Sequence, residues 1–131
     1  MTQNEKDLLL KDLSARLPYE VKVEYKNEIF VVDYVSPIYE DVKLDNCETW
    51  TVGISDVKPY LFPISSMTEE QRKEYNSLVW FGGLSAGWDR DDGVILNEVE
   101  MLIDFYHKNH LDYRGLIDKG LAIDATKLNI Y

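Results

Sequence analysis

Apolar residues near the start of the chain recur three or four positions apart, the spacing that places side chains on one face of a helix. They are Leu9, Leu10, Leu13 and Leu17. The residues before them, TQNE, form a capping-box pattern in which Thr2 and Glu5 can satisfy the first free backbone amides. Pro18 follows and cannot continue the hydrogen-bond ladder. The pattern predicts a first helix that ends at Pro18.

The pattern then changes to alternation of apolar and polar residues, which is typical of strands with one solvated face. Four segments carry this alternation or a weaker form of it: residues 19–25, 28–35, 39–44 and 48–54. Lys26-Asn27 is suited to a hairpin turn between the first two, and Ser36-Pro37 interrupts the second. Consecutive antiparallel strands of this kind predict a meander.

The second half of the chain is predicted to be mainly helical. Residues 56–63 contain two prolines and are predicted to be an extended crossing that cannot donate regularly to a sheet. Overlapping capping boxes at 66–69 and 68–71 predict a second helix to about Trp80. Asn97 with Glu100 predicts the start of a third helix, which ends near residue 109.

The last residues are predicted to be less regular. Asp112 can cap a short helical turn over residues 113–119, with Gly120 at the position that a helix end favours. Residues 121–123 can return as a short strand, followed by a loosely held C-terminus. The elements together predict a single α+β domain over residues 1–131, an antiparallel meander of three to five strands packed with about three helices.

The predicted third helix is apolar on two sides. Its broad face comprises Val99, Leu102, Ile103, Tyr106 and His110. Met101 and Phe105 lie on the opposite side of the helical projection. Such a helix is either sandwiched within the domain, which is the favoured interpretation, or presents Met101 and Phe105 as an edge for a partner.

Charge and cysteine content restrict the possible functions. The formal net charge is −10, spread evenly over both halves of the chain, so nucleic acid and anionic membranes are not expected partners. Cys47 is the only cysteine, which excludes an intrachain disulfide and a cysteine-based zinc site. The polar N-terminus and the absence of long apolar runs predict a cytoplasmic protein.

The connection between the second and third helices, residues 80–93 (WFGGLSAGWDRDDG), is the strongest candidate for a binding site. It is rich in glycine and holds Trp80, Trp88, Asp89, Asp91 and Asp92. Long loops of this composition are often functional, and exposed tryptophans anchor interfaces. The alternative is that both rings close the core under the loop.

Metal-dependent chemistry is poorly supported by the sequence. The aspartates of this loop resemble a calcium-binding loop, but Gly93 comes one residue too early for that motif. His107 and His110 are the only histidines and form an incomplete ligand set, so a structural role is expected for both. No cofactor is predicted.

Three segments carry a family resemblance: residues 10–19 (LKDLSARLPY), 54–67 (ISDVKPYLFPISSM) and 111–125 (LDYRGLIDKGLAIDA). They resemble a family of short, uncharacterised proteins from gut Bacteroidales and their mobile elements. The similarity covers both ends and the centre of the chain but not the 80–93 loop. It implies a cytoplasmic, accessory role and transfers no activity.

The sequence therefore predicts a non-enzymatic binding or regulatory module whose partner is another protein. In this hypothesis the loop residues form the binding epitope, flanked by Met101 and Phe105. One alternative is an acidic decoy that occupies a nucleic-acid-binding protein, because the chain is strongly negative. The other is a metal- or sugar-dependent enzyme, which would need Asp89, Asp91, Glu98, Glu100 and His107 to converge on one cleft.

Overall fold

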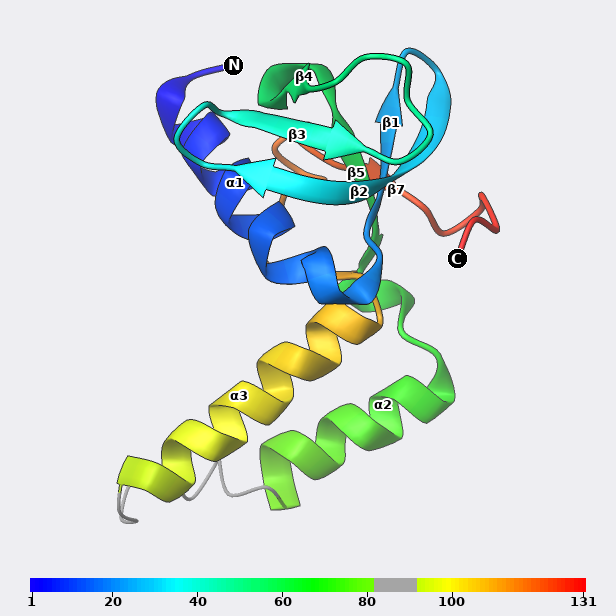
Figure 1. Cartoon of the computed structure of the whole chain (residues 1–131). Helices are drawn as coiled ribbons and strands as arrows, with labels where there is room; N and C mark the ends of the chain where they lie inside the picture. The colour runs from blue at the N-terminus through cyan, green and yellow to red at the C-terminus, as the bar shows by residue number, and fades with distance from the viewer. Residues whose placement is uncertain (82–91) are drawn as a thin grey trace.

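The computed structural model describes residues 1–81 and 92–131, with side chains described for residues 1–79 and 99–131. These residues form three α-helices and a mostly antiparallel sheet of seven strands, which confirms the α+β class (Figure 1). Helix α1 packs against the sheet, while α2 and α3 lie side by side and extend away from it (Figure 1).

Helix α1 (Gln3–Arg16) begins and ends where the sequence predicts. The capping box is formed, because the Glu5 amide donates to Thr2 Oγ1 at 3.2 Å and the Thr2 amide donates to Glu5 Oε1 at 2.9 Å. Pro18 lies in the 3₁₀ turn η1 (Leu17–Tyr19) that terminates the helix. The inner face of α1 buries Leu9, Leu10 and Leu13 against the sheet.

The first four strands form the predicted meander. They are β1 (Lys22–Tyr25), β2 (Glu28–Ser36), β3 (Asp41–Leu44) and β4 (Val52–Gly53), and they lie in the order β4-β3-β2-β1. Lys26 and Asn27 both adopt positive φ, 50° and 64°, as a tight hairpin turn requires. Strands β1 and β4 are shorter than the alternating segments 19–25 and 48–54 that predict them. Tyr19 belongs to η1, and only two residues of segment 48–54 pair with β3.

The prediction for the proline-rich segment was wrong. Strand β5 (Lys58–Pro63) lies inside the sheet, antiparallel to β1 and parallel to both β6 (Leu111–Asp112) and β7 (Ile123–Asp124). Its prolines are the second and last residues, so the residues between them can still bond: the Phe62 amide donates to the His110 carbonyl at 2.8 Å, and the Leu61 carbonyl accepts from Ala125 at 2.9 Å. This strand and its two short partners raise the strand count to seven.

Helices α2 (Glu69–Asn76) and α3 (Asp92–Lys108) form an arm with a small core of its own. The capping box at Thr68 and Gln71 starts α2 as predicted, and the π-helical segment η4 (Ser77–Phe81) continues it. Helix α3 starts five residues before Asn97, so Asn97 is not its cap. The capping pattern is misleading there because the three residues before it, Val94, Ile95 and Leu96, are compatible with a helix, so the helix can begin earlier in the chain.

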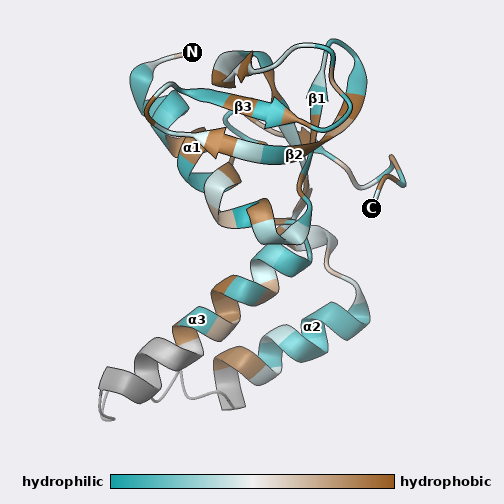
Figure 2. Ribbon diagram, in the orientation of Figure 1, coloured by the Kyte–Doolittle hydropathy of each residue, from teal (hydrophilic) through white to brown (hydrophobic). Residues whose placement is uncertain are grey.

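Two clusters of buried residues hold the molecule together. The first lies between α1 and the sheet, and Figure 2 shows hydrophobic segments in α1, β2 and β3. The second consists of Met67, Phe105 and Leu111, with half-buried aromatic residues of α2 and α3 around them. The arm is thus anchored through its own apolar contacts at the end of β5.

The chain after α3 is also more ordered than predicted. Asp112 accepts from the amides of Leu116 and Ile117 at 2.8 and 2.9 Å, and residues 116–120 form turns that end at Gly120, whose φ is 74°. The expectation of a loose C-terminus was wrong, because the Tyr131 hydroxyl accepts from the Lys22 amide and donates to the Tyr60 carbonyl. The Tyr131 ring stacks on His110 with centroids 3.6 Å apart.

Candidate functional site

The residues that the sequence singled out are only partly described. Trp88, Asp89 and Asp91 lie outside the described residues, and only the backbone is described for Trp80 and Asp92. Met101 is 55% exposed on α3, whereas Phe105 is 1% exposed and lies in the arm's core. Phe105 therefore packs inward and does not form an exposed edge with Met101.

A different surface, the outer face of β2 and β3, presents large aromatic side chains to solvent. Strand β2 contains a bulge between Val32 and Tyr34, so Asp33 and Tyr34 are both exposed while Val32 and Val35 remain buried. A bulge adds one residue and redirects the side chains that follow it. Here it turns Tyr34 outward, with 56% of the residue exposed.

Lys43 and Trp50 extend this surface across the sheet. Lys43 is the direct cross-strand partner of Tyr34. Its ammonium group lies 4.8 Å from the centroid of the Trp50 ring, which is the geometry of a cation–π contact. Trp50 is nevertheless 78% exposed. We refer to Tyr34, Lys43 and Trp50 as the aromatic strip; Asp33 and Thr51 line the same shallow hollow.

The chain around the aromatic strip is strongly acidic. Residues 28–50 contain one lysine, no arginine and six carboxylates: Glu28, Asp33, Glu40, Asp41, Asp45 and Glu48. None of the six is buried. A local charge of −5 is half of the net charge of −10, so this short segment makes a large contribution to the negative field of the protein.

The turn that joins β2 to β3 carries two further exposed apolar residues. Ile38 is 86% exposed and Tyr39 is 79% exposed. The turn is held in place from both sides, since the Tyr39 amide donates to Ser36 Oγ at 3.2 Å and the Glu40 carbonyl accepts from the Ile54 amide at 2.9 Å. A fixed turn presents these side chains at little further cost in conformational entropy.

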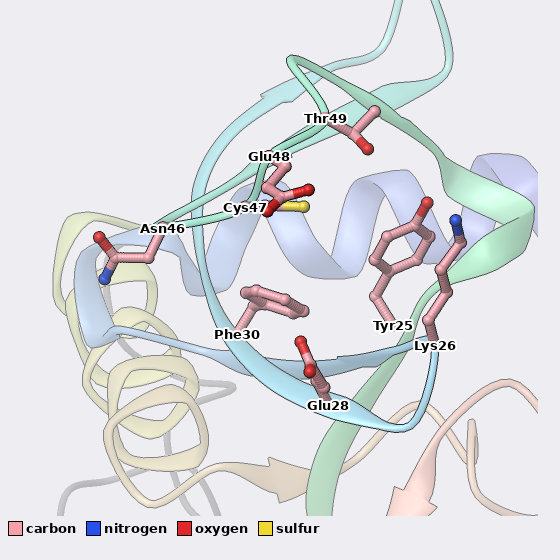
Figure 3. A pocket seen from close by; sticks show the side chains of 8 residues that line it. All are labelled: Tyr25, Lys26, Glu28, Phe30, Asn46, Cys47, Glu48 and Thr49. Carbon is pink, nitrogen blue, oxygen red and sulfur yellow. The ribbon is translucent and has the colours of Figure 1, made fainter.

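A separate pocket lies beside the β1–β2 turn, under the loop that precedes β4 (Figure 3). We call it the loop pocket; it has a volume of about 330 Å³ and is lined by Tyr25, Lys26, Glu28, Phe30, Asn46, Cys47, Glu48 and Thr49. Its polar rim and aromatic floor give it the mixed character of small-molecule sites.

The charged side chains at the junction of the sheet and the arm form a buried network instead. Asp12 and Arg16, both 0% exposed, are joined by a 2.8 Å ion pair, and Arg114 Nε lies 3.1 Å from the other Asp12 oxygen. Arg16 also donates to the Leu111 carbonyl at 2.7 Å. Both Asp12 oxygens and two of the three Arg16 nitrogens are thus paired, while Arg16 Nη1 is buried without a hydrogen-bond partner among the described residues. These mutual contacts of buried charges make the network structural.

Both histidines belong to this junction. His107 Nε2 lies 2.7 Å from the Tyr113 hydroxyl, and burial followed by the charge of Arg16 lowers the pKa of His107. Burial, then the charges of Arg16 and Lys22, lowers the pKa of His110 to about 4. Within the described ranges, no group of three or more His, Cys, Asp or Glu side chains could hold a metal ion.

The comparisons add no relative to this description. No family model, no curated protein and no solved structure matches the chain. Among residues 1–81 and 92–131, no helix is long and apolar enough to cross a membrane.

The sequence reasoning missed the aromatic strip. Trp50 lies in an alternating segment, and this pattern predicts a strand without indicating an exposed surface. One signal is present in the sequence, the single lysine among six carboxylates in residues 28–50. The exposure of both Asp33 and Tyr34 comes from the bulge, which the sequence does not reveal without the pairing partner of the strand.

Proposed function

We propose that the protein is a non-enzymatic binding module and that the aromatic strip is its docking surface for a basic segment of another protein. The observation that carries this proposal is the exposure of Trp50, 78%, beside exposed Tyr34 on one face of the sheet. Tryptophan and tyrosine dominate interface energetics because they bury a large apolar area with few rotatable bonds.

The chemistry around the strip selects the partner. An arginine side chain can stack on an aromatic ring while its guanidinium group pairs with a carboxylate such as Asp33. The six carboxylates of residues 28–50 attract basic segments and repel acidic ones. Ile38 and Tyr39, on the fixed turn at the end of the same hairpin, supply additional apolar contact.

This proposal keeps the function class that the sequence predicts and moves the docking surface from the 80–93 loop to the sheet. The enzyme alternative requires its side chains to converge on one cleft, and the described residues give it no support. His107 is buried, whereas Glu100 is exposed to solvent. The decoy alternative remains distinguishable, because a decoy acts through its overall charge and does not need Trp50.

Selection of binders from a random peptide library, followed by affinity measurements, tests the proposal. We expect enrichment of peptides that carry arginine or lysine next to an apolar residue. Trp50→Ala and Tyr34→Ala should each weaken the selected peptide about tenfold or more, as truncation of an interface anchor does. Raising the salt from 50 to 300 mM should weaken binding further, because exposed charges are screened.

Two control variants locate the site. Met101→Ala removes an exposed apolar side chain from α3 and should leave affinity unchanged. Trp88→Ala probes the loop that the sequence favours, and a loss confined to this variant would overturn the sheet as docking surface. Salt-sensitive binding that ignores Trp50→Ala and Tyr34→Ala would favour the decoy alternative instead.

A further inference from the structure

The loop pocket is a second concave feature, independent of the aromatic strip. Its floor is the open end of the main core: Tyr25, Phe30 and Cys47 are half-buried and pack against that core on their inner sides. The rings of Tyr25 and Phe30 are tilted, with centroids 6.3 Å apart. Figure 3 shows both rings and the Cys47 sulfur facing the same space. The floor can therefore receive an apolar or aromatic group.

The rim of the loop pocket carries an excess of negative charge. Glu28 and Glu48 are exposed, and Figure 3 shows the Glu28 carboxylate directed into the pocket from the strand side and Glu48 above it on the loop. Within the described part of the chain, neither carboxylate has a salt-bridge or hydrogen-bond partner. The one rim cation, Lys26, lies over the Tyr25 ring at 5.3 Å from its centroid.

We propose that the loop pocket binds a small organic ammonium ion with an apolar or aromatic body. A cation is stabilised both by carboxylates and by the faces of aromatic rings, and Glu28, Glu48, Tyr25 and Phe30 offer both at one place. The volume of about 330 Å³ is at the lower end for ligand sites, which limits the body to a single ring or a short chain.

Cys47 provides a direct readout of occupancy. It is the only cysteine of the chain and lines the pocket, so its rate of reaction with a thiol reagent reports access to the floor. We would measure the reaction with Ellman's reagent in the presence of 2-phenylethylamine, 2-phenylethanol or 3-phenylpropionate. These probes share a phenyl body and differ in charge. The amine is expected to slow the reaction at least threefold, at concentrations where the alcohol and the acid do not.

Variants test the rim carboxylates. Glu28→Gln with Glu48→Gln should weaken protection by the amine about tenfold, because each half-solvated ion pair contributes at most about fivefold. Glu100→Gln, an exposed carboxylate on α3, should leave protection unchanged. Circular dichroism confirms that each variant is folded before its reaction is timed.

Three results would overturn the proposal. Equal protection by the amine and the alcohol means that the floor binds apolar groups without recognising a cation. Stronger protection by the acid means that Lys26 determines the preferred charge. Absence of protection by any probe up to millimolar concentration means that the pocket is not a ligand site. None of these probe results bears on contact of a peptide with Tyr34, Lys43 and Trp50, because none of the three lines this pocket.

Discussion

Two clusters of cations and aromatic rings in this molecule use the same chemistry for different ends. At the junction of the sheet and the arm, the guanidinium groups of Arg16 and Arg114 lie 5.4 and 4.9 Å from the centroid of the Tyr113 ring, and Asp12 pairs with both. On the aromatic strip, Lys43 lies over Trp50. The first cluster is mostly buried and the second is mostly exposed.

Burial explains why only one of the two is available to a partner. In the junction, Asp12 accepts from two arginines and Arg16 also donates to a backbone carbonyl, so the groups that hold the arm are already engaged with one another. On the strip, Trp50 makes its cation–π contact with Lys43 and still exposes most of its surface. Residue types alone therefore do not separate a structural cluster from a docking surface.

The largest effect is expected where the buried network is broken. Asp12→Ala removes the carboxylate shared by Arg16 and Arg114 and leaves the Arg16 charge buried without its partner. The free energy of unfolding should fall by about 3–5 kcal/mol, measured by urea denaturation. Asp33→Asn, an exposed carboxylate beside the strip, is the control and should change it by less than about 0.5 kcal/mol. Similar decreases in the free energy of unfolding for the two variants would show that the Asp12 carboxylate contributes no more to stability than an exposed carboxylate does.

The sequence predicted most of the fold because its strongest local signals agree with the tertiary structure. The capping boxes at Thr2 and Thr68 and the turn at Lys26-Asn27 each satisfy their own backbone groups, so they could be recognised without knowledge of their surroundings. Strand β5 could not be recognised in this way. Its pairing with β6 and β7 joins residues about 50–60 positions apart, and its prolines argue locally against a sheet.

The candidate site was harder to predict for a related reason. Tyr34 is exposed because of a bulge in the pairing of β2 with β3. Trp50 is exposed because only two residues of its segment, Val52 and Gly53, pair with β3 as strand β4. The inward position of Phe105 depends on Tyr75 and Tyr106 lying against it in the arm. Each of these properties is set by a partner elsewhere in the chain, which periodicity in one segment does not reveal.

An intermediate effect is expected from acid. The pKa of His110 is lowered to about 4 in the folded protein, whereas an unfolded chain binds that proton near pH 6.5. Between these values the unfolded state binds more protons, so stability should fall as pH decreases from 6.5 towards 4, by up to about 1.4 kcal/mol per pH unit. His110→Gln removes this term, and urea denaturation at pH 7.0 and 5.5 should show a smaller decrease for the variant. Equal decreases would mean that His110 is not protected from protonation at the junction.

The smallest effect on stability is expected on the strip, and it is the most direct check of its availability. Lys43→Ala removes the ammonium group from above the Trp50 ring, a contact that contributes about 0.5–1 kcal/mol at an exposed site. The free energy of unfolding should therefore fall by no more than that. One indole face is also uncovered, so a basic peptide selected on the wild type should bind equally well or more tightly, because a like charge has been removed from its path. A loss of peptide affinity in Lys43→Ala, with stability unchanged, would mean that Lys43 itself contacts the partner and that the partner is not basic at that position.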